Sequence, residues 1–454
     1  MKRRNSIGLS DSELESYMKV LTDSFGLKWL EAKSDHPLQL LWSRNDELST
    51  NELISLAYSI KELLEIDSAW TKKQLQTIKG KDKNNFKGAI FEILGLNMMH
   101  NAAEHPIKPA KFNQAGYDGL ITRNDNTEIR VSIKNYGVSS SQKAFEKKAK
   151  SVENKMLALL KKYKYPPVQI LLDFPDKYPD ERDWKMLEER LDDIFKNQRN
   201  QDEPFTALVE PKNPAFELSK ENNRQIFIII IYPFKLPSEE FHESFYSYTL
   251  MISAKYHDNE HLNLFSKMNE ACSNLLKHSA SENEIVTNSL LLHLPETISL
   301  DQCITWLDNY FEEFSGKEIS FVFLYQTTVA TDLKTNFDGI NHSFKIYIKK
   351  GRQLNGNFKF EVPVGIISDK STTPIYIAEH PNGKRETIPL EDRYIYQHGE
   401  HYLKMVPNGK GGYDGNIRKI GSGVHTNLVM QFPGQNEKTV IKGKFAPTDE
   451  LLIL

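Results

Sequence analysis

Several side chains between residues 92 and 134 are of the types that hold a metal ion and act on a phosphate ester. Glu92 and Asp118 are carboxylates, and Ser132 and Lys134 follow on a later segment, two positions apart. Mg²⁺ binds oxygen ligands and tolerates few protein carboxylates. A metal ion held in this way polarises a phosphodiester and lowers the pKa of a bound water, and a nearby lysine stabilises the negative charge that develops. These residue types suit metal-dependent phosphodiester hydrolysis with Mg²⁺ or Mn²⁺ as cofactor.

A hairpin of two strands is expected to carry Asp118 and Lys134. Residues 117–122 and 129–135 have the β-branched content and alternation of strands, and the residues between them are typical of turns. Alternation on the second strand places its apolar side chains on a face that packs and leaves its polar face free for chemistry. The apolar side chains are Ile129, Val131 and Ile133, and the polar ones are Arg130, Ser132 and Lys134.

The centre of the turn predicts which residues of the hairpin face each other. With the centre near Asp125 and Asn126, residues whose numbers sum to about 251 or 252 are paired. Asp118 would then face Ile133 or Lys134. We therefore expect a carboxylate and an ammonium group to meet at one end of the hairpin.

A helix is expected on each side of this hairpin. Residues 84–100 have an apolar stripe at helical spacing, made of Phe86, Ile90, Ile93, Leu94 and Met98. Glu92 lies off that stripe, and its helical neighbours Gly88 and Gly95 would let another backbone or a ligand come close. Residues 139–164 are predicted to form the second helix, which is rich in lysine.

The order of these residues and elements resembles the PD-(D/E)XK nuclease superfamily, whose core is helix, strand, strand with Asp, strand with (E/S)-x-K, then helix. The matching pieces are Glu92 in residues 91–94, Asp118 in residues 116–119 and Ser132-Ile133-Lys134-Asn135, within roughly residues 80–175. The resemblance implies that Asp118 holds a divalent metal, that Lys134 orients or activates the attacking water and that Glu92 completes the metal site.

Ser132 stands where most of that superfamily has Glu or Gln. Some restriction enzymes of the superfamily have a similar S-x-K, with the missing acid supplied from the helix that follows. Glu146 sits on the predicted second helix and is the candidate for that acid. Glu92 and Glu146 therefore stay open as alternatives for completing the metal site.

Charge is distributed unevenly along the chain. The whole chain has 58 Lys+Arg against 61 Asp+Glu, but residues 72–164 hold 19 against 8. A local positive potential of this kind suits a polyanion, since phosphate contacts supply most non-specific affinity for nucleic acid. We expect double-stranded DNA as the partner, contacted by Lys143, Lys147, Lys150 and Asn135. The alternative for most of the lysines is a solvated helix face.

Composition excludes several other classes of protein. No apolar run approaches the roughly 20 residues of a membrane span, and residues 1–6 are basic without the apolar segment of a signal peptide, so we expect a cytoplasmic location. Cys272 and Cys303 have no metal-like spacing. The sequence has no His/Cys cluster, P-loop or nucleophile elbow, which argues against zinc hydrolysis, ATP-driven work and acyl transfer.

The predicted fold is mixed α/β with a restriction-endonuclease-like core. Its parts are a helical N-terminal region, the nuclease core, a mixed α/β region that completes or extends the core, and a β-rich C-terminal domain, at residues 1–80, 81–175, 176–340 and 341–454. The function expected by analogy is a metal-dependent endonuclease acting on DNA, in bacterial restriction or anti-phage defence. The alternatives are an inactive nuclease-fold binding subunit, which Ser132 favours, and an RNA-directed nuclease. A homodimer or a partner subunit is compatible with the sequence, which demonstrates neither.

Overall fold

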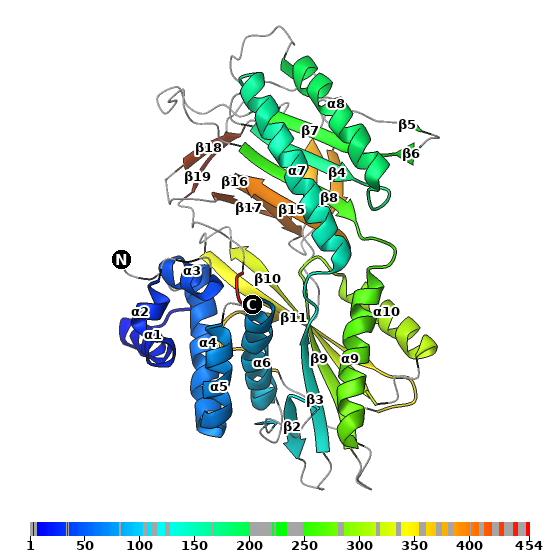
Figure 1. Ribbon diagram of the computed structural model, residues 1–454. Coiled ribbons are helices and arrows are strands. Elements are labelled where there is room, and N and C mark those ends of the chain that lie inside the picture. The colour runs from blue at the N-terminus through cyan, green and yellow to red at the C-terminus, as the bar shows by residue number, and fades with distance from the viewer. Residues whose placement is uncertain are drawn as a thin grey trace. The chain divides into compact units, whose positions relative to one another are not determined.

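Helices dominate the first part of the chain and strands the last in the computed structural model (Figure 1). The predicted mixed α/β class, helical N-terminal region and strand-rich C-terminal half are confirmed. The structure describes residues 3, 7–32, 34, 36–80, 83–102, 107–110, 116–122, 128–165, 168–199, 220–221, 224–233, 248–279, 286–314, 318–332, 337–353, 360–368, 375–379, 385–399, 401–407, 413–419, 426–430, 439–443 and 451–454.

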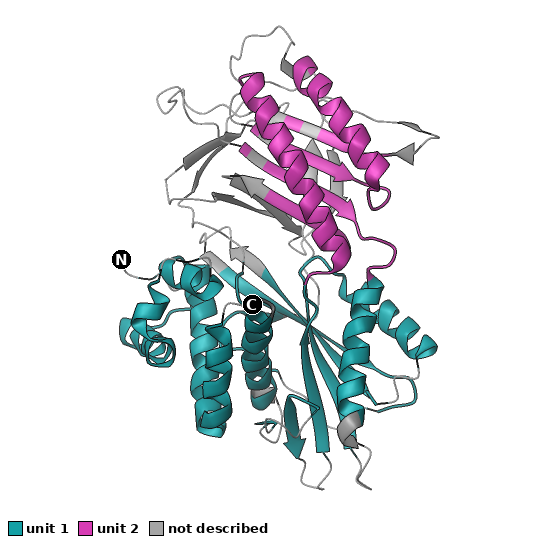
Figure 2. Cartoon of the chain, in the orientation of Figure 1, with its two compact units in different colours: residues 1–137, 261–372, 450–454 teal, residues 138–260, 373–449 magenta. Residues whose placement is uncertain are grey.

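Two compact units divide the chain, and each is built from stretches that are separate in the sequence (Figure 2). Unit 1 comprises residues 1–137, 261–372 and 450–454, and unit 2 comprises residues 138–260 and 373–449. These units differ from the four consecutive ranges predicted from the sequence. The difference arises because residues 138–260 are inserted between two strands that are neighbours in one sheet of unit 1.

The helices of unit 1 come mostly from its first segment. They are α1 (Asp11–Phe25), α2 (Leu27–Leu30), α3 (Pro37–Ser43), α4 (Glu47–Ile66), α5 (Ser68–Ile78), α6 (Lys83–Ala102), α9 (His261–Ser279) and α10 (Leu300–Glu313). Side chains cap the starts of several: Ser10 forms a capping box with Glu13 on α1, and Asp46 accepts a hydrogen bond from the backbone of α4. None of the described helices is both long and apolar enough to span a membrane.

A seven-stranded mixed sheet is the centre of unit 1, with the strand order β1-β2-β3-β9-β10-β11-β12. Its strands are β1 (Lys108–Pro109), β2 (Gly119–Thr122), β3 (Glu128–Asn135), β9 (Val286–Leu294), β10 (Phe321–Asp332), β11 (Phe337–Ile348) and β12 (Ile366–Ser368). The strands β3, β9 and β10 are parallel to one another, whereas β1, β2 and β3 form an antiparallel meander. Beyond them, β11 is antiparallel to β10 and parallel to β12, so the parallel strands β3, β9 and β10 lie in the middle of the sheet.

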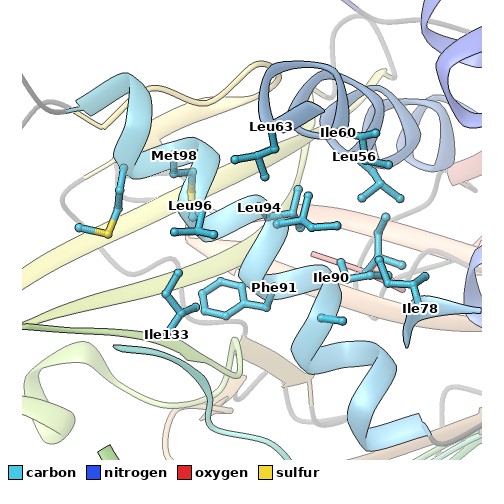
Figure 3. Packing of buried hydrophobic residues seen from close by; sticks show 14 of the residues in the cluster. Leu56, Ile60, Leu63, Ile78, Ile90, Phe91, Leu94, Leu96, Met98 and Ile133 are labelled. Carbon is cyan, nitrogen blue, oxygen red and sulfur yellow. The ribbon is translucent and has the colours of Figure 1, made fainter. Parts of the chain in front are cut away.

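Helices α4, α5 and α6 pack apolar side chains together and against the sheet. The predicted stripe of α6 is buried throughout and belongs to this core. Figure 3 shows the packing of part of the cluster, with labels on Leu56, Ile60, Leu63, Ile78, Ile90, Phe91, Leu94, Leu96, Met98 and Ile133. A Cβ added to Gly95 of α6 would lie 2.8 Å from Leu291 Cδ2 and 3.3 Å from Ile133 Cγ2. Gly95 therefore allows α6 to approach β3 and β9 closely.

The segment 451–454 is held in unit 1 by a buried carboxylate of α4. Oε2 of Glu52 accepts hydrogen bonds from the backbone N–H groups of Leu452, Ile453 and Leu454, at 2.9, 2.7 and 3.2 Å. The other oxygen, Oε1, is buried and has no hydrogen-bond partner among the residues that the structure describes. Burial raises the pKa of Glu52 to about 7, against the opposing effects of these N–H groups and of Arg44.

Unit 2 is an α/β unit with a four-stranded sheet in the order β15-β8-β4-β7. Its main elements are α7 (Ser140–Lys162), β4 (Val168–Phe174), α8 (Glu181–Arg199), β7 (Ile228–Pro233), β8 (Tyr248–Lys255) and β15 (Arg393–Gly399). Its further strands are β5 (Lys220–Glu221), β6 (Arg224–Gln225), β13 (Ile375–Glu379), β14 (Arg385–Pro389), β16 (His401–Pro407), β17 (Tyr413–Lys419), β18 (Thr426–Met430) and β19 (Thr439–Gly443). Apolar side chains of α7, α8 and the four-stranded sheet form one buried cluster.

Candidate active site

The hairpin predicted around Asp118 is present, but its register differs from the prediction. Strands β2 and β3 pair Gly119 with Val131 and Thr122 with Glu128, so paired numbers sum to 250. The observed pairing is centred on position 125, whereas the predicted sums of 251 and 252 are centred half a residue and one residue later. Asp118 directly precedes β2, and this register does not pair it with Ile133 or Lys134, so that predicted pairing is wrong.

The backbone and Ser132 hold the carboxylate of Asp118 in place. Its Oδ2 accepts hydrogen bonds from the backbone N–H of Ile133 at 2.6 Å and from Ser132 Oγ at 3.3 Å. The backbone N–H of Asp118 donates to the carbonyl of Val131 at 2.8 Å. Among the described residues, Oδ1 accepts no hydrogen bond. Asp118 is therefore oriented through one oxygen while the other stays available to a ligand.

The sequence predicted that the polar face of β3 is free for chemistry, and this prediction is wrong. Ser132 is 1% exposed and Arg130 is 5% exposed, because β3 is an interior strand between β2 and β9. Arg130 forms an ion pair with Glu128 at 3.1 Å and lies over the ring of Tyr117. The two ends of the strand, at Glu128 and at Lys134, are partly exposed.

Glu92 reaches the same site from α6. Burial and, to a smaller extent, the charge of Asp118 raise the pKa of Glu92 to about 7, against the opposing effects of Lys134 and of a hydrogen bond from Gln74. Oε2 of Glu92 accepts a hydrogen bond of 2.6 Å from Nε2 of Gln74 on α5. The structure therefore brings Glu92, Asp118 and Lys134 close enough to affect one another's charge.

Lys134 has a third acidic neighbour, which the sequence did not indicate. Its Nζ lies 3.4 Å from Oε1 of Glu270 on α9. Burial raises the pKa of Asp118, and the charge of Glu270 raises it as well. The charge of Lys134 and the hydrogen bond from the Ile133 N–H oppose this shift. Glu270 therefore belongs to the same electrostatic group as Asp118 and Lys134.

Glu146 does not join this group within unit 1. It lies on α7, which is part of unit 2, and its Oε1 accepts a hydrogen bond of 3.0 Å from Gln142. The helix of unit 1 that follows β3 and leads into β9 is α9. Within unit 1, the helix after the lysine strand thus supplies Glu270 and not Glu146.

The predicted nucleic-acid contacts fall into different surroundings. Lys143 and Lys147 are exposed on α7. Lys150 instead forms an ion pair of 2.5 Å with buried Glu153, which also accepts hydrogen bonds from Tyr248 and Tyr396. Two other lysines of α7 pair with acids of α8, Lys148 with Glu181 and Lys162 with Asp192. Part of the positive charge predicted for this helix is therefore neutralised inside unit 2.

Asn135 occupies the end of β3, next to Lys134. Its Oδ1 accepts a hydrogen bond of 3.0 Å from the backbone N–H of Gly137, and its side chain is half-buried. The bond makes Asn135 part of the turn that ends the strand.

Asp118 and Glu92 are two acids of the types that bind a magnesium ion, and the charge of Asp118 acts on Glu92. No group of three or more His, Cys, Asp or Glu side chains able to hold a metal occurs in the part of the chain that the structure describes. Two carboxylates are nevertheless sufficient for Mg²⁺, which keeps several waters and shares its coordination with substrate phosphate. Burial is the largest cause of the raised pKa of both acids, and a divalent cation would favour their charged forms.

Sequence reasoning missed Gln74 and Glu270. A signal for Gln74 was present, because it occupies a position in the buried stripe of α5 that otherwise holds Trp70, Thr71, Leu75 and Ile78. Glu270 gave no such signal, since it is half exposed on α9 and resembles any solvated acid.

Comparisons with models of protein families, with curated proteins and with solved structures find no match for this chain.

Proposed function

We propose that the chain is a metal-dependent nuclease that hydrolyses phosphodiester bonds, with double-stranded DNA as its substrate. The observation that carries the proposal is the convergence of Asp118, Glu92 and Lys134 at the end of β3. Lys134 pairs with Leu292 of the parallel strand β9, so the site lies at the carboxyl ends of neighbouring parallel strands. This edge is where open α/β sheets usually bind their ligands.

The order of elements in unit 1 supports the resemblance to PD-(D/E)XK nucleases. Helix α6 precedes the antiparallel strands β1, β2 and β3, and helix α9 then leads into β9. The residues that match the superfamily's motif fall on α6, at the start of β2 and on β3. This is the order of helix, strands and helix that the resemblance implies, once the inserted unit 2 is set aside.

Each residue of the site has a role in the proposed reaction. Asp118 and Glu92 would hold Mg²⁺ or Mn²⁺, which when bound polarises the phosphate and acidifies a water. Ser132 orients Asp118 through its hydroxyl. Lys134 stabilises the charge that develops on the phosphate or orients the attacking water, and Glu270 fixes the position of its ammonium group. The proposal extends to action in the cytoplasm, in restriction or anti-phage defence.

The test is cleavage of supercoiled plasmid and of a matched RNA by the purified chain, in Mg²⁺ or Mn²⁺ and in EDTA. We expect metal-dependent nicking or cutting of DNA that is lost in Asp118→Asn and in Lys134→Met, both shown to be folded by circular dichroism. Cleavage of RNA but not of DNA would show that the substrate is RNA. Cutting by both variants at the parent's rate would overturn the site, and binding of DNA without cutting in any metal would favour the binding subunit that Ser132 suggests.

A further inference from the structure

The N-terminal helices contribute one polar side chain, Gln74 of α5, to the candidate site. Gln74 is 8% exposed and lies on α5 among buried Trp70, Thr71 and Leu75. A buried amide costs free energy unless it is hydrogen-bonded. Its Nε2 donates to Oε2 of Glu92 at 2.6 Å.

We propose that Gln74 is a positioning residue for metal binding, holding the Glu92 carboxylate in the orientation in which it takes the cation. This inference rests on the proposed nuclease function, because it assigns Glu92 to the metal site. It also gives α5 a part in the active site, beyond packing against α6.

The chemistry of the amide suits this task better than that of a charged donor. A lysine or arginine at position 74 would neutralise Glu92 and compete with the metal ion for its oxygens. The amide of Gln74 instead donates one hydrogen bond and leaves the negative charge of the carboxylate in place. Only Oε2 of Glu92 is engaged in this way among the described residues, so Oε1 is left for a ligand.

The hydrogen bond also fixes a side chain that otherwise has rotational freedom. Glu92 sits off the buried stripe of α6, so apolar packing alone does not select its rotamer. Partners that orient metal ligands in this way are worth roughly 10-fold to 100-fold in metal affinity or activity. The alternative is that the hydrogen bond only satisfies the buried amide of Gln74 and has no part in metal binding. The two roles differ in whether the effect of replacing Gln74 on metal affinity requires Glu92.

The experiment is a double-mutant cycle with Mn²⁺ alone as the probe. Gln74→Met removes the donor and keeps the length of the side chain, and Gln74→Leu serves if the first variant does not fold. Glu92→Gln and the double variant complete the cycle. Gln76→Met, exposed on the same helix, is the matched control. Calorimetry gives the Mn²⁺ dissociation constant, plasmid cleavage gives the metal concentration for half-maximal rate, and thermal melting reports folding.

We expect Gln74→Met to raise the Mn²⁺ dissociation constant about 10-fold or more and to shift the cleavage midpoint equally, while Gln76→Met changes neither. In the Glu92→Gln background the same substitution should have no further effect. An unchanged dissociation constant in Gln74→Met, or the same change with and without Glu92, would overturn the positioning role while the parent still cuts DNA. A parent chain that neither binds Mn²⁺ nor cuts would instead overturn the nuclease itself, and the inference with it.

Discussion

The ammonium group of Lys134 on β3 lies 3.4 Å from the carboxylate of Glu270 on α9. Lys134 is 18% exposed and Glu270 is 50% exposed, so water screens the pair and its contribution to stability is small. Its importance is geometric, because it limits where the ammonium group can go beside Asp118.

Replacing Glu270 by Gln should slow cleavage. Without the carboxylate, Lys134 is free to swing toward Asp118 and Glu92, and we expect kcat to fall about 10-fold because orientation at the reacting group is lost. The measurement is single-turnover cleavage of plasmid at saturating Mg²⁺. Glu146→Gln is the matched comparison on α7, and we expect it to keep the parent's rate. The reverse pattern, with Glu146→Gln slow and Glu270→Gln unaffected, would restore the acid predicted from the sequence.

The two glycines that flank Glu92 on α6 should respond in opposite directions to alanine. Gly95→Ala would force its Cβ against buried Leu291 and Ile133, and overpacking of this kind costs roughly 1–3 kcal/mol. A Cβ at Gly88 would meet no atom of the described residues within 4 Å, so Gly88→Ala should stabilise the helix by roughly 0.5–1 kcal/mol. Urea unfolding measures both. A destabilised Gly88→Ala beside a neutral Gly95→Ala would contradict the close packing of α6 on the sheet.

Exposed lysines of α7 should matter for DNA binding, and paired ones should not. Lys143 and Lys147 are exposed, whereas Lys162 forms an ion pair of 2.7 Å with Asp192. If the first two contact phosphates, the double alanine variant should bind DNA more weakly and lower the slope of log affinity against log salt by about 2. Lys162→Ala is the control and should leave the slope unchanged. Fluorescence anisotropy across a salt series, with EDTA present to prevent cutting, gives both slopes. An equal loss of DNA affinity in the two variants would indicate that the overall positive charge of α7 matters, and not contacts made by Lys143 and Lys147.

Glu52 should make the stability of unit 1 depend on pH. Burial raises its pKa from 4.5 to about 7, so between these values the folded chain keeps a proton that the unfolded chain has lost. The contribution of Glu52 to the free energy of unfolding is therefore fully present below about pH 4.5. It falls as pH rises through 7, by about 3 kcal/mol in total. Glu52→Gln stays neutral and should lose this dependence. Urea unfolding at pH 5 and pH 8 measures it, with exposed Glu65→Gln on the same helix as control. Equal pH dependence in the parent and Glu52→Gln would contradict the buried acid.

Local elements of the site could be predicted from the sequence because their signals are short-range. The apolar stripe from Phe86 to Met98 predicted α6, and the alternation of residues 129–135 predicted β3. The joint spacing of Glu92, Asp118 and Lys134 led to a group of side chains that the structure does bring together. The predicted register of the hairpin is wrong because it depends on which residue lies at the centre of the turn, which composition does not reveal.

Contacts between distant segments could not be predicted from the same patterns. Nothing in the sequence of β3 indicates that its parallel neighbour is β9, on the far side of an inserted unit. The acid beside Lys134 was therefore sought on the next helix in the sequence, where Glu146 lies, instead of on α9. Glu270 and Gln74 both come from helices whose place in the site is set by tertiary packing.

The insertion of residues 138–260 between β3 and β9 has a consequence for biosynthesis. At translation rates of roughly 5–20 residues per second, β9 follows β3 out of the ribosome after an interval on the order of ten seconds. During that interval the nascent chain carries Glu92, Asp118 and Lys134 without the strand that supports β3 and without the helix that restrains the lysine. Residues of the candidate site are thus synthesised before the site can form. The site can assemble only after β9 has been synthesised and has paired with β3.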